Sequence, residues 1–202
     1  MARYELYRRI KRNIYWRVFS LLFGGDFKNF GRRVRITSPL KIEGAKYIEI
    51  GDGTIINDLG WLMATPIDDN EPLLTIGRDT YIGHMAHIVC VRRVNIGNNV
   101  ITADRIYISD NIHGYEDIET PVIHQKVQFK GEASVGDDSW LGENVCIIGA
   151  RIGKHCVIGA NSVVTRDIPD YSIAVGMPAR VIKKYDFETR RWESIKEKEV
   201  VG

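Results

Sequence analysis

Aliphatic residues return at every sixth position along most of this chain, and many have a glycine directly behind them. Ile76, Ile82, Ile88 and Val94 keep this spacing without a break. Further runs keep it after shifts of frame: Ile36, Ile42, Ile48; Ile50, Ile56, Leu62; Ile96, Thr102, Ile108; Phe129, Val135, Leu141, Ile147; and Ile152, Ile158, Val164. A period of six fits neither an α-helix nor a simple alternating strand. It is typical of a β-helix built from hexapeptide repeats.

Each hexapeptide would form one face of a roughly triangular coil, as a short parallel strand followed by a tight turn. The aliphatic residue would point into the prism and stack on its equivalent in the next coil, because one hexapeptide alone buries almost nothing. Glycine, asparagine and aspartate near the corners tolerate the turn backbone, including positive φ. The sequence therefore predicts an all-β fold, a parallel β-helix domain over 30–184 with a protruding loop over 109–128.

The two ends of the chain depart from the repeat. Residues 1–35 hold ten Lys or Arg against two acidic residues, a net charge of +8, interleaved with aromatic and aliphatic side chains. This pattern predicts a basic amphipathic helix within an N-terminal segment 1–25, over roughly 3–23 and ended by Gly24 and Gly25. Such a helix can cap one end of the prism or lie on an anionic membrane surface. The tail over 185–202, with Trp192 and Ile195 among charges, predicts a short C-terminal surface helix.

Several classes of protein do not fit the composition. No run of 18 apolar residues suggests a membrane-spanning helix, and no secretory signal pattern is evident. The basic arm lacks a nucleic-acid reading motif, so no nucleic-acid partner is expected. Cys90, Cys146 and Cys156 are odd in number and lack metal-ligand spacing, which favours buried thiols in a reducing compartment. We expect a cytoplasmic protein, with peripheral contact at the inner membrane face as the open role of residues 3–23.

The protruding loop is where we expect the chemistry. A β-helix interior offers no polar pocket of its own, so functional groups must come from excursions and from clefts between copies. The loop begins with the sequence Ser-Asp-Asn-Ile-His-Gly-Tyr from position 109. Together with the stretches 96–100, 135–142, 158–169 and 174–182, it resembles the hexapeptide-repeat acyltransferases, and more narrowly their branch of sugar O-acetyltransferases that modify surface polysaccharides. The resemblance covers about 34–184 and implies that the β-helix is left-handed.

The resemblance implies that His113 is the catalytic base. A neutral imidazole, whose ordinary pKa lies near working pH, would take the proton of an acceptor hydroxyl as that oxygen attacks the thioester of acetyl-CoA. Nothing in the loop has the pattern of an acyl-carrying nucleophile with a paired base, so direct transfer is preferred. Asp110, Asn111 and Asp117 stay open as the residue that orients His113.

The resemblance also implies a set of acetyl-CoA contacts. Backbone groups at Gly142 and Ala160 would follow the pantetheine arm, and Trp140 would pack on it or brace the loop. The adenosine end and the phosphates would meet Thr165, Arg166, Arg180 and Lys183, with solvated surface charge as the alternative for the basic members.

Acceptor recognition cannot be carried over from relatives. Galactoside- and maltose-type members use an asparagine and an aspartate where this chain has Gly83 and Val91. The candidates for acceptor contact are instead polar or aromatic residues near the loop and in earlier coils: Asp110, Asn111, Tyr115 and His84, and further Trp61, His87, Asp104 and Arg105.

Three functions remain after this reasoning. The first is an acetyl-CoA-dependent O-acetyltransferase acting on a sugar hydroxyl of a surface polysaccharide precursor. The second is a metal-dependent lyase like the β-helical carbonic anhydrases, which needs three converging histidines. His84 and His87 are three apart, which on a strand aims them at opposite faces, so no metal is expected. The third is a non-catalytic variant or an N-acetyltransferase on an amino sugar. Family geometry implies a homotrimer with acetyl-CoA between neighbouring prisms.

Overall fold

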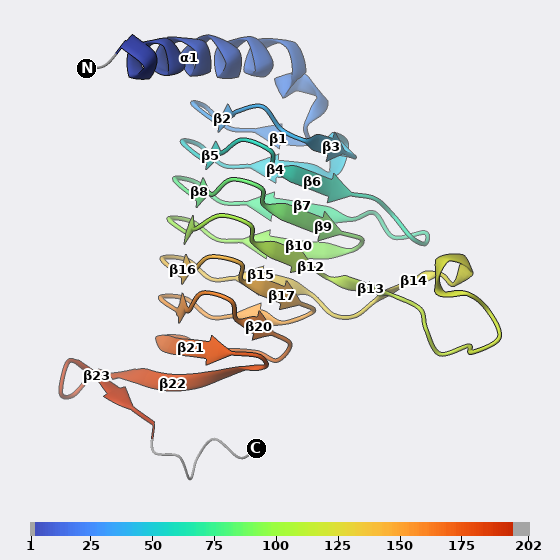
Figure 1. Ribbon diagram of the computed structural model, residues 1–202, viewed down its shortest axis with the longest axis vertical. Helices are drawn as coiled ribbons and strands as arrows, with labels where there is room; N and C mark the ends of the chain where they lie inside the picture. Colours follow the sequence, from blue (N-terminus) through green and yellow to red (C-terminus); the bar gives the residue numbers. More distant parts are fainter. Residues whose placement is uncertain (1–2, 196–202) are drawn as a thin grey trace.

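The computed structural model describes residues 3–195 as a triangular stack of coils with a helix across one end (Figure 1). The expected left-handed parallel β-helix is confirmed, and its three faces are three parallel sheets.

Face A contains β1 (Asn29–Phe30), β4 (Ile48–Ile50), β7 (Leu73–Ile76), β10 (Arg93–Ile96), β15 (Ala133–Val135) and β18 (Arg151–Ile152). Face B contains β2 (Arg35–Ile36), β5 (Ile55–Ile56), β8 (Tyr81–Ile82), β11 (Ile101–Thr102), β16 (Trp140–Leu141), β19 (Val157–Ile158) and β21 (Ser172–Gly176). Face C contains β3 (Lys41–Glu43), β6 (Trp61–Ala64), β9 (His87–Cys90), β12 (Tyr107–Ser109), β17 (Cys146–Ile148) and β20 (Val163–Val164).

The predicted repeat positions form the interior. On face C, the register pairs Ile88 with Ile108 and Ile108 with Ile147, and all three side chains have no exposed surface. Equivalent stacks run inside the other two faces, since nearly every repeat aliphatic belongs to one buried cluster. Stacking like residues on like therefore supplies the apolar burial that a single coil lacks.

The turns between faces define three edges, which we call A/B, B/C and C/A after the faces they join. Asparagine and aspartate take positive φ in these turns, as at Asn99 (53°), Asp138 (60°) and Asn144 (56°). These residue types tolerate the left-handed region better than others, so the corner prediction is confirmed.

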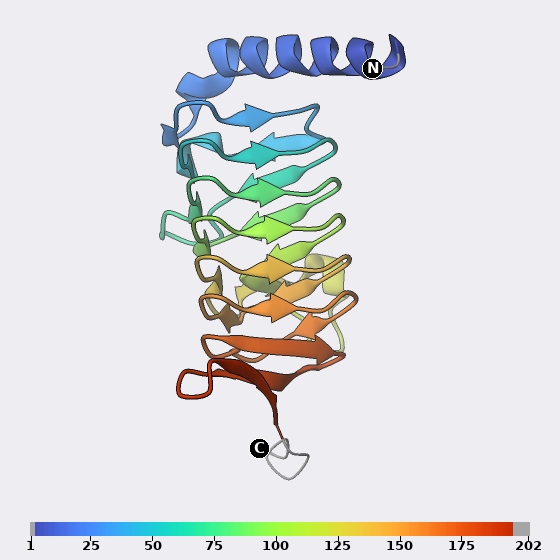
Figure 2. The same ribbon diagram turned by 90° about the vertical axis from the view of Figure 1, so that its left-hand side faces the viewer.

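The N-terminal helix is confirmed as α1 (Arg3–Phe23), followed by η1 (Gly24–Asp26). It lies across the end of the prism (Figure 2). Phe19 is buried against the first coil, where it joins the apolar core cluster, and the side chain of Arg35 on β2 lies over the ring of Trp16. The capping role of α1 is thus visible directly. None of the helices within residues 3–195 is long and apolar enough to cross a membrane.

Two excursions leave the coil at the C/A edge. The first, 65–72, joins β6 to β7. The second leaves after β12 and is built on an antiparallel pair, β13 (Asn111–His113) and β14 (Val127–Phe129), with η3 (Val122–His124) between them. The prediction that Phe129 lies inside the prism is wrong. It pairs with Asn111 at the root of this hairpin, and the interior stack resumes only at Ala133 and Val135.

The predicted C-terminal helix is wrong for its described part. The chain instead continues as β22 (Ala179–Asp186), antiparallel to β21, and β23 (Arg191–Ser194), antiparallel to β22. The last coil leaves an open sheet edge whose backbone groups need partners, and this hairpin pairs with them. Tyr185 and Trp192, which the sequence suggested for a helix, face each other across the two strands with ring centres 5.5 Å apart. Residues 196–202 of the predicted tail lie outside the described residues.

Candidate active site

The loop histidine lies on the projecting hairpin. His113 is the last residue of β13, is paired with Val127, and has an exposed side chain. The hairpin is closed beyond it by the backbone N–H of Gly114, which donates to the carbonyl oxygen of Lys126 at 3.0 Å. The imidazole is therefore held outside the prism on an ordered strand.

Asp110 anchors the base of this loop. Its side chain is completely buried, and its carboxylate accepts the backbone N–H groups of Val91 (2.9 Å), Arg92 (2.8 Å) and Arg93 (2.8 Å). Three charge-assisted hydrogen bonds fix the turn of the coil above to the root of the loop. The expectation that Asp110 contacts the acceptor is wrong for this chain, because its carboxylate is already fully used inside the fold.

A second anchor lies beside the first. The guanidinium of Arg92 forms an ion pair with Asp68 of the 65–72 excursion and lies 5.0 Å from the ring centre of Phe129 on β14. One cation thus connects the two excursions at the C/A edge. Ser109 takes part in the same root: its hydroxyl donates to the carbonyl oxygen of Asn111 at 3.0 Å and is fully buried. Ser109 therefore has no access to an acyl group.

None of the three candidates for orienting His113 touches its ring. Asp110 serves the backbone, and the side-chain amide of Asn111 donates to Asp110 at 3.1 Å. The carboxylate of Asp117 accepts the Thr120 hydroxyl at 2.7 Å and the Glu119 N–H at 2.9 Å, and the Thr120 hydroxyl lowers its pKa. Within residues 3–195, no hydrogen bond to the His113 imidazole is recorded. One chain alone therefore leaves the predicted base without a partner that sets its orientation.

Three of the predicted acetyl-CoA contacts lie together at the B/C edge. Trp140 projects from face B with half of its side chain exposed, and Gly142 follows it in the turn. Ala160 occupies the same place one coil further on: a Cβ on Gly142 would lie 2.6 Å from the Ala160 nitrogen. Only glycine fits this close approach of two backbones. The result is a strip of small residues, Gly142 and Ala160, beside an exposed indole, which suits an extended linear ligand.

The other predicted cofactor residues are placed elsewhere. Thr165 and Arg166 are exposed in the C/A turn of the last complete coil, after β20. Arg180 and Lys183 are half-buried on β22, which extends face B, and Arg180 donates to the carbonyl oxygen of Ala179 at 3.0 Å. The structure therefore gathers Trp140, Gly142 and Ala160 but not the four residues expected near the nucleotide end.

The B/C edge also carries a row of polar side chains above this strip. The Nδ1 atom of His84 lies 3.1 Å from Oδ1 of Asp104, which also accepts the His84 backbone N–H at 2.7 Å. This backbone bond, and then the ring, hold the pKa of Asp104 below its usual value. Asp104 donates its own N–H to Glu143 at 3.2 Å, and Glu143 pairs with Arg105.

The His84 and Asp104 pairing was missed at the sequence level, although both residues were named separately. The length of one coil, 20 residues in this part of the chain, would have predicted the pairing. Gly83 and Ala103 precede them, and a Cβ on Gly83 would lie 2.2 Å from the Ala103 carbonyl oxygen, so the two turns are directly stacked. Residues 20 apart in the regular part of the coil are vertical neighbours.

The remaining candidates line face C or the loop. The ring of His87 stacks on Trp61 at 4.2 Å between centres and meets the edge of Tyr107 at 5.3 Å, and burial lowers its pKa. Tyr115 is exposed beyond His113. Among the residues that the structure describes, no three His, Cys, Asp or Glu side chains gather as a metal site would require. Burial raises the pKa of the Cys90 thiol to about 12, so this cysteine is unreactive.

The two halves of the predicted site lie on different edges of one prism. The hairpin with His113 projects from the C/A edge, whereas Gly142 and Ala160 lie at the B/C edge, and face C separates them (Figure 1). The predicted base and the predicted acetyl-CoA strip are therefore not adjacent within one chain.

Comparison with known proteins agrees with this architecture. Residues 132–166 match the family model described as the hexapeptide repeat of succinyl-transferase. The chain is 32% identical over 190 residues to the probable acetyltransferase Rv3034c of Mycobacterium tuberculosis, a match that covers 89% of this chain and 58% of the relative. It is 36% identical over 119 residues to the putative lipopolysaccharide biosynthesis O-acetyl transferase WbbJ of Escherichia coli, covering 55% of this chain and 61% of the relative. The chain thus spans less than two thirds of these curated relatives.

Solved structures share the fold. A mutant of AntD, an N-acyltransferase from Bacillus cereus in complex with dTDP and coenzyme A, superposes with a TM-score of 0.70 at 20% identity over 84% of this chain and 91% of that one. A hexapeptide-repeat containing acetyltransferase from Vibrio cholerae, VCA0836, complexed with acetyl coenzyme A, gives a TM-score of 0.55 at 26% identity over 82% of this chain and 75% of that one. Its six-residue repeat, its stacked coils and these relatives make the chain similar in sequence and fold to the hexapeptide-repeat acyltransferases.

Proposed function

We propose that this protein is an O-acetyltransferase that moves the acetyl group of acetyl-CoA to a sugar hydroxyl of a surface polysaccharide precursor. The single observation that carries the proposal is the exposed imidazole of His113 on an ordered hairpin that projects from the prism. The printed names of the relatives, an acetyltransferase and a lipopolysaccharide biosynthesis O-acetyl transferase, support the same reaction class. The acetyl-CoA held by the Vibrio cholerae structure supports the donor.

The chemistry follows from these groups. Neutral His113 accepts the proton of the acceptor hydroxyl while that oxygen attacks the thioester carbonyl carbon. The resulting tetrahedral intermediate collapses with departure of the CoA thiolate, and the imidazolium returns the proton to the sulfur. No acyl-enzyme is formed, because Ser109 is buried and Cys90 keeps its proton. General base catalysis of this kind contributes roughly 10²- to 10⁴-fold, and holding both substrates in place contributes further.

The proposal includes a homotrimer with parallel prisms. The hairpin of one copy would lie over the B/C edge of the next, which brings His113 to the strip formed by Gly142 and Ala160. The thioester would lie along that strip, with Trp140 beside the pantetheine arm. Three equivalent sites would form per trimer. The missing orientation of the imidazole supports this arrangement, since a neighbouring copy would provide the polar partner that one chain lacks.

Acceptor contacts are proposed at the same seam. Tyr115 extends beyond His113 on the hairpin, and the paired His84 and Asp104 lie above the strip on the B/C edge. A carboxylate that holds one imidazole and one backbone N–H keeps acceptor capacity for sugar hydroxyls. We place the reaction on the cytoplasmic side of the membrane, where acetyl-CoA is available.

The test is acetyl-CoA turnover with a panel of acceptors. Purified protein is incubated with acetyl-CoA and nucleotide sugars or glycan fragments, released CoA thiol is followed, and products are identified by mass spectrometry. Acceptor-dependent CoA release with a gain of one acetyl group as an ester supports the proposal. Acetylation of amino sugars alone would instead establish an N-acetyltransferase, and no acceptor-dependent release across the panel would contradict acyl transfer.

A further inference from the structure

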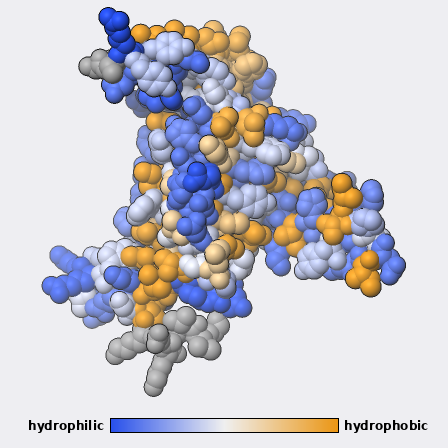
Figure 3. Space-filling view, viewed as in Figure 1, coloured by the Kyte–Doolittle hydropathy of each residue, from blue (hydrophilic) through white to orange (hydrophobic). Residues whose placement is uncertain are grey.

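The outer side of α1 carries an apolar stripe that the prism does not cover. Ile10, Ile14, Val18 and Leu21 are spaced by four, four and three residues and therefore lie along one side of the helix. All four are largely exposed, with Leu21 at 85%, although Phe19 on the other side is buried. Figure 3 shows this apolar surface along the side of the helix that points away from the coils.

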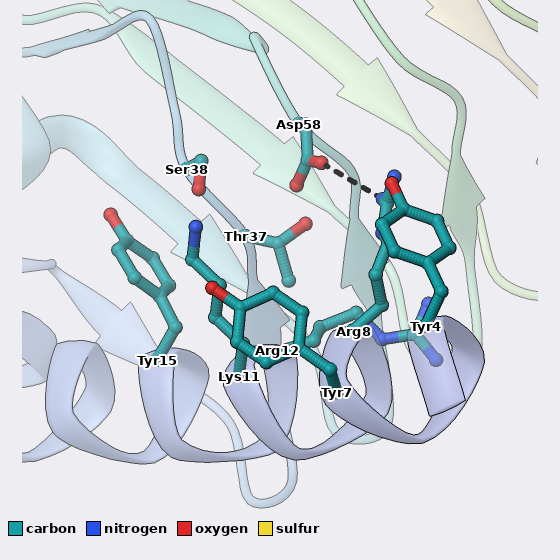
Figure 4. A pocket seen from close by; sticks show the side chains of 9 residues that line it. All are labelled: Tyr4, Tyr7, Arg8, Lys11, Arg12, Tyr15, Thr37, Ser38 and Asp58. Atoms are coloured by element: carbon teal, nitrogen blue, oxygen red, sulfur yellow. Dashed lines mark ion pairs between the residues drawn. The ribbon is translucent and has the colours of Figure 1, made fainter.

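A cationic pocket opens on the flank of the same helix, between α1 and the first turns of the B/C edge (Figure 4). Its volume is about 270 Å³, and the residues that line it are Tyr4, Tyr7, Arg8, Lys11, Arg12, Tyr15, Thr37, Ser38 and Asp58. Arg8, Lys11 and the three tyrosines extend from the helix toward the coil, and Arg12 lies along the helix (Figure 4). Among the described residues, the ion pairs in this pocket amount to Arg8 with Asp58 at 3.9 Å. A net positive charge therefore remains for an anionic group.

The pocket continues into an apolar groove. Lys11 and Tyr15 line both, and the groove is otherwise formed by Ile14, Val18, Phe19 and Phe23. A polar, cationic compartment that opens directly into an apolar one matches an amphiphile with an anionic head. Arg and Lys bind phosphate oxygens well, and tyrosine is favoured at the level of lipid headgroups.

Because α1 lies across the end of the prism, its exposed apolar stripe forms the end surface of the molecule. The helix lies across that end in both views (Figures 1 and 2), so the stripe faces along the axis of the prism. In the proposed trimer the prisms are parallel, and three copies of α1 would lie at the same end. An interfacial helix sinks about 5–10 Å into the headgroup region, which places lipid phosphates beside its flank, where the pocket opens.

We propose that α1 binds the surface of an anionic phospholipid bilayer, with the apolar stripe in the interface and the phosphate of one lipid in the cationic pocket. The inference rests on the proposed function only for the three-fold arrangement. The net charge of +8 over residues 1–35 is complementary to such a surface. A bilayer bound here would hold the trimer axis upright, with the hairpins projecting parallel to the membrane. A membrane-linked glycan would then reach the seams from the side.

The test is flotation of full-length protein with vesicles of phosphatidylcholine alone or with 30% phosphatidylglycerol. We expect binding only to the anionic vesicles, weakened by raising the salt concentration because exposed charges are screened. Equal binding to both vesicle types, or none, would overturn the proposal. The double variant Ile14→Asn, Leu21→Asn is expected to abolish binding with an unchanged melting temperature, since both side chains are exposed. Retained binding would show that the stripe is not the contact.

A matched pair of variants tests the pocket. Lys11→Gln with Arg12→Gln removes two pocket cations, and Arg9→Gln with Arg17→Gln removes two cations of the same helix that do not line it. Removing two cations near an anionic surface costs about thirtyfold in affinity wherever they lie on the helix. We therefore expect that loss for the control pair and a larger loss for the pocket pair, whose cations also bind the lipid phosphate directly. Equal losses would overturn the headgroup site.

Three further readouts separate the alternatives. Saturable binding of inorganic phosphate to the pocket, together with vesicle binding that the Lys11→Gln, Arg12→Gln pair does not weaken more than the control pair, would assign the pocket to a free anion and overturn the lipid site. A change in oligomeric state of the stripe variant would make a second copy of this chain the occupant. Acetyl-CoA turnover with a soluble acceptor is expected to be unchanged in all variants, so its loss would concern the proposed function and not the membrane contact.

Discussion

The prism and its projecting hairpin are held together in opposite ways. The prism is held by the same two contacts in every coil. Each interior aliphatic side chain stacks on the one in the next coil, and backbone hydrogen bonds of parallel β-sheets join each coil to its neighbours. The hairpin depends on a few unique contacts at its root, chiefly the Asp110 carboxylate and the Arg92 guanidinium. Its exposed side chains include Ile118 at 92% and Tyr115 at 63%. Stability is therefore distributed over the coil, whereas the proposed chemistry is concentrated on a segment that contributes little to it.

The largest expected effect separates chemistry from stability on the hairpin. His113→Ala should lower turnover by roughly 10²- to 10⁴-fold, because the general base is lost. The melting temperature and the dissociation constant of CoA should stay unchanged, because the side chain is exposed and records no hydrogen bond within the described chain. Steady-state kinetics, calorimetry and thermal unfolding check this. Turnover within threefold of the original protein would remove His113 from the mechanism.

A substitution in the prism should have the opposite profile. Ile88→Ala opens a cavity in a stack with no exposed surface and should cost about 2–5 kcal/mol of unfolding free energy. Turnover per folded molecule should be nearly unchanged. Denaturant titration measures the difference, with Ile118→Ala on the hairpin as the control, for which we expect less than about 0.5 kcal/mol. Equal losses at the two sites would contradict the division between prism and hairpin.

Asp110 joins the two regions, so its replacement should affect both. Asp110→Ala leaves the buried N–H groups of Val91, Arg92 and Arg93 without an acceptor and should cost about 1–3 kcal/mol. Turnover should fall beyond this, because the root of the hairpin that carries His113 loosens. Asp110→Asn keeps one carbonyl acceptor and should restore part of both quantities. Normal turnover in the Ala variant would show that the root does not position the histidine.

The smallest expected effect is a pH dependence at the root of the excursions. The N–H of Asn70, then its side chain and Arg92, lower the pKa of Asp68 to about 2 from an ordinary value of 3.8. A lowered carboxyl pKa adds stability above the ordinary value, and this contribution is lost as the pH falls from about 4 to about 2. Asp68→Asn should flatten that part of the stability profile by a small amount, since the group is exposed. An unchanged profile would show that the pair contributes nothing.

The same contrast explains what the sequence could predict. The coil follows from a local repeat, so its interior residues and corners could be assigned one by one. Phe129 kept the spacing by coincidence and lies on the hairpin. Nothing local distinguishes it from a core residue, because its partner Arg92 lies in another coil. The tail over 185–195 became strands because an open sheet edge was available, which the pattern of Tyr185 and Trp192 alone does not reveal.

For the candidate site, the sequence indicated residue types but not their arrangement in space. The loop around His113 and the place of Gly142 in the repeat made both residues candidates, and their roles stay predictions. The use of Asp110 could not, because a buried carboxylate that accepts three N–H groups looks in sequence like any loop aspartate. The pair His84 and Asp104 required the register of two coils. The structure adds the contacts between residues that lie far apart in the chain, whereas the residue types were already known from the sequence.

The central claim is that each site combines the hairpin of one copy with the B/C edge of the next. It is tested by mixing two inactive variants, His113→Ala and Ala160→Trp, the second of which blocks the strip at an exposed position. After dissociation and reassembly of an equal mixture, one seam in four pairs an intact hairpin with an intact strip, so we expect about a quarter of the original turnover. Turnover that stays at the level of the separate variants would contradict a site shared between copies.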